Sequence, residues 1–547
     1  MPLDVLLTGR IATLTGAMGF GWVEAIGIRA GRVAFAGSAA DLEGRADPST
    51  KRIALAPDEV AVPGLTDAHL HLAQAAIARG HLDLTDAPTL ESGLARIHDA
   101  HVMGRGPDAW LEGHGWDADR WGGWPTADDL ERVAPGRRIA LWAHDHHALW
   151  ASHAALAAAE LGDGDPPGGV IRRDASGRPE GILYEAATRL VTIHVPPPAP
   201  DALANAIVAV GRELVALGVV ACHDPGGLAP DPDLTYDIPV YARLADAGDL
   251  PVRVHACVRD DALESAIAQG LRSGTVLGAD PNGRARVGWQ KCFADGSLGS
   301  RTAALLEDIE PEPGRPLPPD RRRGVWMTER DVLVERVARA TAGGITTTIH
   351  AIGDAAVRVA LDVLSEGARE QPLMPRIEHV QMLHPADRPR FAAAGIAASV
   401  QPVHLGSDAL MARRLWGERA EAEAYTWKAI ADTGAVMPFG TDAPVEPIDP
   451  WPGLALAVRR EDLRWPSGTQ PFAPDQALTL ERALRANCVD PALSARELDR
   501  GRLTVGQRAD IVILDAAVID APVEPGGPLS TARPRAVLMD GQVVFER

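Results

Sequence analysis

The sequence predicts an α/β fold, a (β/α)8 TIM barrel, because short apolar segments alternate with helical patterns along the middle of the chain. The helical patterns include DALANAIVAVGRELVALG and ERDVLVERVARATAGG. Such alternation is typical of a parallel sheet, and eight repeats favour a closed barrel. The eight apolar segments are VAVPGLTDAHLHL, GVVACHD, PVRVHACV, RVGWQKCFADG, GITTTIHAIG, PRIEHVQML, GIAASVQPVH and AVMPFGTDAPV.

A doubly wound open sheet is the alternative to a barrel. That fold normally carries a glycine-rich phosphate-binding loop directly after its first strand. The corresponding stretch here reads LTDAHLHLAQ and holds no glycine. The barrel is therefore the favoured prediction.

Both ends of the chain are rich in short β-like runs. They include DVLLTGRIATLTG and WVEAIGIRAGRVAFAGS near the start and RADIVILDAAVI and RAVLMDGQVVFER near the end. Because chain termini often lie close together, we expect residues 1–62 and 496–547 to form one composite β-sandwich domain. Two separate hairpins are the alternative. The barrel would then occupy residues 63–495.

One gap between predicted strands is far longer than the others. About 140 residues separate the first apolar segment from the second, well beyond an ordinary connection. Insertions of this size after a barrel strand lie over its C-terminal face. We therefore expect a lid subdomain over about residues 80–200.

Composition narrows the classes of partner and compartment. The chain has 547 residues and a net charge of −20, and its longest basic run is Arg321 to Arg323, which argues against nucleic acid and anionic membranes as partners. It has no apolar stretch long enough to span a membrane and no signal-peptide pattern. The four cysteines form no CxxC motif, so a reducing compartment, the cytoplasm, is the expectation.

Polar side chains gather at the ends of the apolar segments, where the active sites of such barrels lie. His69 and His71 are two residues apart, so both side chains point to the same side of a strand. Burying several imidazoles and a carboxylate without a partner is unfavourable, so a bound metal is the favoured explanation and a hydrogen-bonded polar plug the alternative. Other segments carry or end in Lys291, His350, Glu378 with His379, and Thr441 with Asp442.

Lys291 is unusual in this chain. Of the 54 basic residues only three are lysines, at positions 51, 291 and 428. Arginine does not lose its proton in proteins, whereas a buried lysine near cations has a lowered pKa and supplies a neutral amine. Such an amine is either a Schiff-base nucleophile or a group that is modified and then binds metal, and spacing does not choose between them.

Five motifs together resemble the metal-dependent amidohydrolase superfamily. They are similar above all to its third amidohydrolase subgroup, which includes N-substituted formamide deformylase-like enzymes. The resemblance covers nearly the whole chain, with the terminal β-rich stretches and the long insertion. The motifs are PGLTDAHLHL, the WQKCFADG segment around Lys291, TTTIHAIGD, RIEHVQ and GTDAPVEPIDPW.

The resemblance implies a centre of one or two divalent ions, most readily zinc, although iron, manganese, cobalt and nickel also suit histidine-rich sites. Asp442 would be the catalytic group that moves a proton from a metal-activated water to the leaving group. Lys291 would be N6-carboxylated and bridge the ions. The more buried ion would be held by His69, His71 and Asp442, and the second by His350 and His379.

The resemblance also suggests residues that bind substrate. GWDADRW (115–121) fits the subgroup, and HHALWASHAAL (146–156) fits it except that Ser152 and His153 stand where an Asn-Ser pair is usual, so its substrate specificity does not carry over. Asp354 is expected to cap the helix that begins there. The candidate substrate-binding residues are Trp116, Asp117, His147, His223, Asp295 and Arg301.

The favoured function is hydrolysis of a C–N bond in an amide or formamide-like small molecule by a metal-activated hydroxide. A deaminase or a lactone or carbamate hydrolase is the alternative within metal chemistry. Two alternatives come from other functional classes: a non-catalytic ligand-binding barrel and a Schiff-base lyase. The expected partner is a small-molecule substrate, with a homodimer as one option for the assembly.

Overall fold

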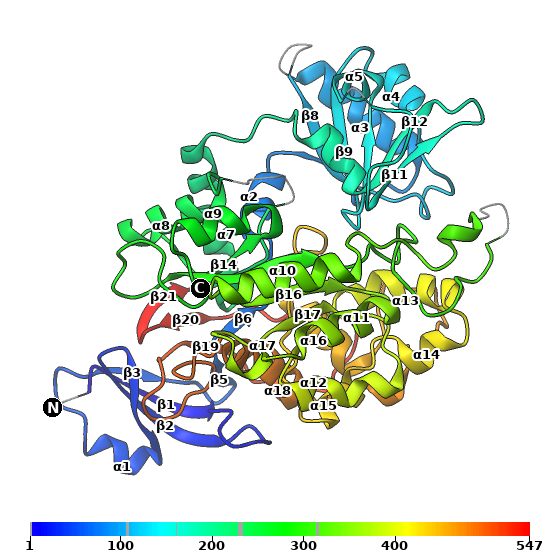
Figure 1. Ribbon diagram of the computed structural model, residues 1–547. Helices are drawn as coiled ribbons and strands as arrows, with labels where there is room; N and C mark the ends of the chain where they lie inside the picture. Colours follow the sequence, from blue (N-terminus) through cyan, green and yellow to red (C-terminus); the bar gives the residue numbers. More distant parts are fainter. Residues whose placement is uncertain (1–2, 105–108, 160, 228–232, 313–316) are drawn as a thin grey trace.

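The computed structural model of the chain describes residues 3–104, 109–159, 161–227, 233–312 and 317–547. The predicted ranges 1–62, 63–495 and 80–200 therefore include a few positions outside the described residues. Figure 1 shows three parts: the insertion strands β8–β12 at the top, helices around a central sheet, and the strands of both chain ends below and beside it.

The central sheet has seven parallel strands in the order β18-β17-β16-β15-β14-β13-β6. Its strands are almost wholly buried, as expected when helices cover a parallel sheet. The strands are β6 Leu65–Asp67, β13 Val219–Asp224, β14 Arg253–Arg259, β15 Ala285–Phe293, β16 Thr347–Ala351, β17 Arg376–His379 and β18 Ala397–Ser399.

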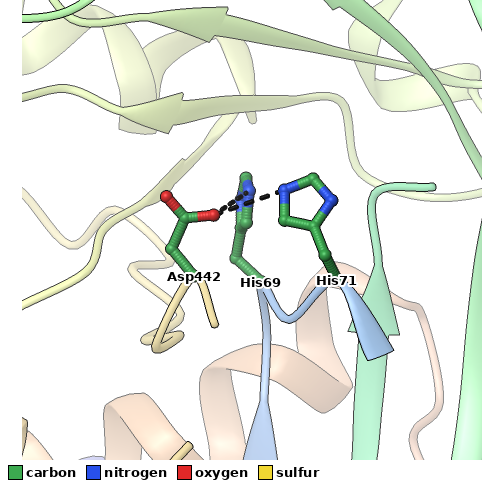
Figure 2. Close-up of side chains that lie close together, drawn as sticks. All are labelled: His69, His71 and Asp442. Carbon is green, nitrogen blue, oxygen red and sulfur yellow. Dashed lines mark ion pairs between the residues drawn. The ribbon is translucent and has the colours of Figure 1, made fainter. Parts of the chain in front are cut away.

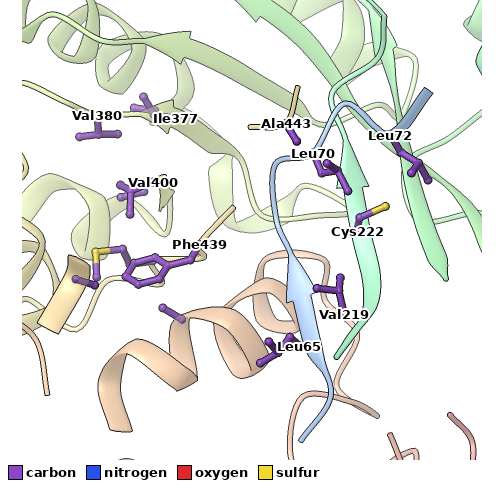
Figure 3. Packing of buried hydrophobic residues seen from close by; sticks show 14 of the residues in the cluster. Leu65, Leu70, Leu72, Val219, Cys222, Ile377, Val380, Val400, Phe439 and Ala443 are labelled. Atoms are coloured by element: carbon purple, nitrogen blue, oxygen red, sulfur yellow. The ribbon is translucent and has the colours of Figure 1, made fainter. Parts of the chain in front are cut away.

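Helices pack on this sheet through apolar faces. In α11 the buried residues recur at helical spacing, for example Val357, Leu361 and Leu364. Figure 3 shows Leu65 and Val219 packing together from β6 and β13, with Phe439 and Val400 on neighbouring chain segments. The helices are α2 Leu72–Ala78, α7 Pro200–Ala216, α8 Asp237–Ala247, α9 Leu263–Ala268, α10 Arg330–Ala342, α11 Asp354–Leu364, α12 Arg388–Ala394, α13 His404–Leu415, α14 Arg419–Glu423, α15 Trp427–Asp432, α16 Pro450–Arg459 and α17 Leu480–Ser494.

The predicted eighth strand, AVMPFGTDAPV, is not a regular strand. Its backbone nevertheless bonds to both edges of the curled sheet. The carbonyl of Pro438 accepts from Val400 N at 3.0 Å, and that of Phe439 accepts from Ala68 N at 2.9 Å. Asp442 N donates to the carbonyl of His69 at 2.6 Å. The segment thus brings Asp442 beside the histidines that follow β6.

Strands from the two ends of the chain share one eight-stranded sheet, ordered β21-β20-β19-β5-β1-β2-β3 with β4 beside β1. The first predicted barrel segment is in fact split, because β5 lies in this sheet and β6 in the central one. Gly64 separates them, and a Cβ there would lie 2.7 Å from Val220 Cγ2. The elements are β1 Val5–Ala12, β2 Trp22–Arg29, β3 Arg32–Gly37, α1 Ala39–Glu43, β4 Lys51–Ala54, β5 Glu59–Pro63, β19 Ile511–Asp515, α18 Ala517–Asp520, β20 Ala536–Met539 and β21 Gln542–Glu546.

A buried ion-pair cluster joins this sheet to the central one. Arg253, at the start of β14, donates to Asp510 at 2.8 Å and to Asp540 at 2.7 Å. The side chains of Arg253 and Asp510 are 4% and 6% exposed, so removing either partner leaves a buried charge uncompensated.

We expect Arg253→Met to lower the free energy of unfolding by about 3–5 kcal/mol, because Asp510 would remain buried without its cation. Urea denaturation followed by circular dichroism measures the change. Arg243→Met is the matched control, since the Arg243–Asp201 pair is exposed and such pairs contribute about 0–1 kcal/mol. Equal destabilisation by the two variants would contradict this role of Arg253.

The long insertion has its own six-stranded sheet, ordered β11-β12-β10-β9-β8-β7, and its own apolar core. Tryptophans dominate that core, and the rings of Trp116, Trp121 and Trp150 pack with centroids 6.0–6.5 Å apart. The elements are β7 Leu82–Asp83, α3 Leu90–Met103, β8 Leu111–Trp116, α4 Ala127–Val133, β9 Ile139–Ala143, β10 Ala148–Ala151, α5 His153–Ala158, β11 Gly169–Arg173, β12 Pro179–Glu185 and α6 Arg189–Thr192.

In the described part of the chain, none of the helices combines the length and the apolar character needed to cross a membrane.

Candidate metal centre

A cavity of about 310 Å³ opens where the central strands end. Lys291 of β15, His350 of β16 and His379 of β17 line it. Residues of the insertion, such as His147 and Glu185, form part of its wall. The strand ends that the sequence predicted to meet therefore do meet at one cavity.

His69, His71 and Asp442 form a first group of ligand atoms, all within 4.8 Å of one another and all buried. Figure 2 shows both imidazoles turned toward the same carboxylate. Asp442 Oδ1 lies 3.2 Å from His69 Nε2 and 3.3 Å from His71 Nε2. These are the three residues predicted to hold the more buried ion.

A second group contains His379, His404 and, again, Asp442. Asp442 Oδ2 lies 3.2 Å from His404 Nε2, so the two oxygens of one carboxylate serve two groups. The predicted partner of His379 was instead His350. The His350 ring lies 4.4 Å from that of His379, but its Nε2 faces the carbonyl of Gly296 at 3.0 Å. The second group thus contains His404, which was not predicted, while His350 lines the same cavity without belonging to this group.

The inner histidines are oriented through their second ring nitrogens. His69 Nδ1 lies 2.7 Å from Glu378 Oε2, and His71 Nδ1 lies 2.6 Å from the carbonyl of Gly226. These contacts place the proton of each neutral imidazole on Nδ1 and leave Nε2 free to bind a cation. His69 Nε2 is buried and has no hydrogen-bond partner, which is the state expected of a metal ligand.

Glu378 is itself held as a carboxylate. Burial alone would raise its pKa, but Arg376 and His69 outweigh burial and keep the pKa of Glu378 below its usual value. Arg376 donates to Glu378 Oε1, and Thr348 Oγ1 does so at 2.5 Å. The chain from Arg376 through Glu378 to His69 therefore fixes the orientation of one candidate ligand.

We expect Glu378→Gln to weaken metal binding by roughly 10- to 100-fold, the scale on which such orienting partners act. Competition with a chromophoric zinc chelator measures the affinity. Glu59→Gln is the control, because Glu59 is also a buried glutamate paired with an arginine, Arg535, but lies in the terminal sheet. Unchanged affinity in Glu378→Gln would contradict the orienting role.

Asp442 is held in an uncommon backbone conformation. Its φ is 61°, and that of His379 is 75°, values that side-chain-bearing residues adopt rarely and most often at functional sites. Thr441 Oγ1 donates to Asp67 at 2.6 Å and supports the loop. Gly440 packs so closely that a Cβ would lie 2.5 Å from His69 N. The uncommon backbone conformation and the close packing of Gly440 together fix the position of the Asp442 carboxylate.

Lys291 lines the cavity and is 1% exposed. Burial lowers its pKa to about 8, although the carboxylates of Glu378 and Asp442 act in the opposite direction. A neutral amine is consequently far more accessible here than on an exposed lysine.

His147 enters the cavity wall from the insertion. Its Nδ1 lies 2.7 Å from Glu185 Oε2. Burial would lower the pKa of His147, but Glu185 and Asp145 outweigh it and raise the pKa to about 9. Of the residues predicted to bind substrate, His147 is the one that lies in this cavity.

Three other predicted substrate residues lie elsewhere. Trp116, Asp117 and Arg301 line an adjoining cavity of about 770 Å³. Trp116 is buried in the insertion core and donates to the carbonyl of Leu141 at 2.8 Å, and Arg301 pairs with Asp119 and Glu312. Packing and ion pairing therefore already account for Trp116 and Arg301.

His223 and Asp295 are absent from the walls of both cavities, contrary to prediction. Asp295 accepts the backbone N–H groups of Ala304, Ile352 and Gly353, so it joins loops. His223 Nδ1 faces Arg376 Nη1 at 2.8 Å. The expected cap is also wrong, because Gly353 is the N-cap and Asp354 accepts from Leu306 N instead.

The sequence prediction missed His404 and the role of Glu378. Both carry a signal in retrospect. His404 ends the seventh apolar segment, GIAASVQPVH, and Glu378 directly precedes His379.

Comparison with known proteins finds relatives that match nearly the whole chain. N-substituted formamide deformylase of Arthrobacter pascens is 27% identical over 543 residues, covering 96% of this chain and 95% of that protein. Protein LONG AFTER FAR-RED 3 of Arabidopsis thaliana is 30% identical over 529 residues, covering 93% and 87%. The crystal structure of an uncharacterized metal-dependent hydrolase from Pyrococcus horikoshii OT3 matches with a TM-score of 0.71 and 26% identity, covering 93% and 97%.

The model of the amidohydrolase family matches residues 56–545, a span that contains every residue of the two ligand groups. The resemblance read from the five sequence motifs is thereby confirmed. The α/β fold with its curled parallel sheet agrees with the matched metal-dependent hydrolase. The chain belongs to the amidohydrolase family, and it is a hydrolytic enzyme.

Proposed function

We propose that the enzyme uses a divalent metal to hydrolyse a C–N bond of an amide or formamide-like small molecule. The observation that carries this proposal is the sharing of Asp442 by two groups of buried ligand atoms at the cavity. Three imidazoles around one carboxylate, one of them with an orphaned nitrogen, suit a cation such as zinc. The names of the matched formamide deformylase and metal-dependent hydrolase support the same chemistry.

A bound divalent ion supplies Lewis acidity and makes hydroxide available near neutral pH. His69, His71 and Asp442 would hold it, with His379 and His404 as further ligands. Asp442 would accept the proton of the attacking water and pass it to the leaving nitrogen. Water thus adds to the carbonyl carbon, the C–N bond breaks, and an acid and an amine leave.

Lys291 would react as a neutral amine with CO2 and lose a proton, and the resulting carbamate would add a bridging carboxylate to the centre. Its burial and its lowered pKa support this step, because only the neutral amine attacks CO2. His350, on the neighbouring strand, would be a further ligand on this side of the metal centre.

The fold would serve this chemistry in three parts. Residues 63–495 would form a barrel closed by the 436–442 segment, and residues 1–62 with 496–547 would form the composite β domain beside it. The insertion, about residues 80–200, would cover the cavity and contribute His147. The cavity volume of about 310 Å³ suits a small-molecule substrate.

Metal removal tests this proposal. Dialysis against a chelator should abolish release of amine from a panel of N-substituted formamides and simple amides, and adding zinc or another divalent ion should restore it. Dialysis without chelator is the control, and mass spectrometry of the metal content verifies the removal. Full activity in demonstrably metal-free protein would refute the proposal.

A further inference from the structure

Arg259 is a cavity residue that neither the metal centre nor the proposed mechanism uses. It is the last residue of β14 and pairs in register with Lys291 on β15. Its guanidinium lies over the ring of Phe293, with Cζ 4.7 Å from the centroid. Its stem packs near Gly226, whose carbonyl orients His71. Arg259 therefore stands next to the proposed reaction centre.

Among the described residues, the guanidinium of Arg259 has no anionic partner. Its Nε and Nη1 are buried without a hydrogen-bond acceptor, and the described residues provide it with no ion pair. The two other arginines in the cavity wall are paired: Arg336 with Asp260, and Arg189 with Asp261 at 3.4 Å. Burying the hydrogen-bond donors of an unpaired guanidinium costs free energy. An anionic ligand would supply the missing acceptors.

The carboxylates that the protein offers to this cavity are engaged elsewhere. Asp145 accepts the hydroxyls of Ser297 and Ser300, Glu185 pairs with His147, and Asp260 pairs with Arg336. Asp408 accepts from Gln381 and Tyr425, and Asp442 belongs to the two ligand groups. An anion that meets Arg259 must therefore come from outside the described protein atoms. A guanidinium presents planar, forked donors that match a carboxylate at two points.

We propose that Arg259 binds a carboxylate group of the substrate, so that the enzyme acts on N-acylated or N-formylated amino acids and related amide acids. This inference rests on the proposed function, because the amide must lie at the metal centre while the carboxylate lies at Arg259. Water still adds to the amide carbonyl and the C–N bond still breaks, and the carboxylate held by Arg259 passes unchanged into the amine product.

Matched pairs of compounds test the inference. The probes are the N-formyl derivatives of glycine, leucine and phenylalanine, each compared with its carboxamide, which has the same shape but no charge. We expect metal-loaded wild-type enzyme to prefer the acids by roughly 10-fold or more in kcat/KM, the value of a charge-assisted hydrogen bond. Arg259→Met should abolish this preference while leaving the carboxamides nearly unaffected, and Arg259→Lys should retain part of it.

Arg336→Met is the matched control, because it removes a paired arginine from the same cavity, and it should keep the preference for the acids. Metal content and circular dichroism verify that each variant folds. An unchanged ratio of acid to carboxamide in Arg259→Met, or an equal loss in Arg336→Met, would overturn the inference. An equal fall for acids and carboxamides, with loss of the carbamate signal of Lys291 in 13C NMR, would also overturn it, because Arg259 would then serve the modified lysine.

Calorimetry separates this inference from the proposed function. If the wild-type enzyme cleaves none of the probes but binds the acids more tightly than the carboxamides, and Arg259→Met loses that difference, the carboxylate site stands and hydrolysis of these compounds fails. If the probes are cleaved without regard to charge, the hydrolytic function stands and the carboxylate site fails. Absence of both cleavage and charge-dependent binding would refute the carboxylate site.

Discussion

Asp442→Asn is expected to reduce kcat/KM by roughly 10³-fold or more, the upper range for loss of a group that acts directly in a reaction. Its two carboxylate oxygens face His69, His71 and His404, so the substitution removes charge from both ligand groups at once. Asparagine keeps the shape of the side chain but does not take up the proton of the attacking water. Metal content should fall together with activity.

Asp449→Asn is the control for this experiment. Asp449 follows on the same loop, caps α16 and pairs with Arg533, but it belongs to neither ligand group. We expect it to keep its metal and most of its activity. An Asp442→Asn enzyme with native turnover would remove the central residue from the proposed mechanism.

Lys291→Arg is the second substitution with a large expected effect. Arginine keeps the positive charge and the approximate length, but it does not lose its proton and does not form a carbamate. If Lys291 acts as a carboxylated ligand, activity should fall roughly 10³-fold, as for loss of a directly acting group. Steady-state kinetics and metal analysis of the purified variant measure both effects.

Lys428→Arg supplies the control, because this exposed lysine pairs with Asp432 one helical turn away. We expect Lys428→Arg to be indistinguishable from the wild type. Native activity in Lys291→Arg would show that the buried amine takes no part in the chemistry, and reduction of an enzyme–substrate adduct by borohydride would instead favour a Schiff base.

The strand ends that carry the site were readable from the sequence. His69 and His71 have the two-residue spacing of a strand face, and Lys291, His350 and His379 lie near the ends of successive apolar runs. The C-terminal ends of parallel strands lie at the same edge of a sheet, so side chains at those ends lie near one another. For this reason the sequence alone indicated that Lys291, His350 and His379 would line one cavity.

Other positions depended on contacts that a sequence does not reveal. His223 lies near the end of β13 and Asp295 follows β15, yet Arg376 engages the first and backbone amides engage the second. Trp116 fitted a motif, but its burial in the insertion core follows from packing between β8 and β9. Residue type shows which partners a side chain can accept, and only the fold shows which partner is within reach.

The distinction between His350 and His404 has the same origin. Both end apolar segments, but the His350 ring is turned to the carbonyl of Gly296, while His404 begins α13 and faces Asp442. The irregular 436–442 segment sets the position of that carboxylate, and its backbone has a φ of 61° at Asp442. Arg259 went unnoticed because an arginine at a strand end is common, and its lack of a partner appears only in three dimensions.

Anomalous X-ray diffraction from crystals of the active enzyme, measured on both sides of the zinc absorption edge, tests the central claim most directly. The proposed metal centre predicts a peak about 2.0–2.2 Å from the Nε2 atoms of His69 and His71 and from a carboxylate oxygen of Asp442. A second peak, if two ions bind, should lie beside His379. Fully active crystals without any metal peak in this cavity, measured also at the iron, manganese, cobalt and nickel edges, would contradict a metal-dependent hydrolase.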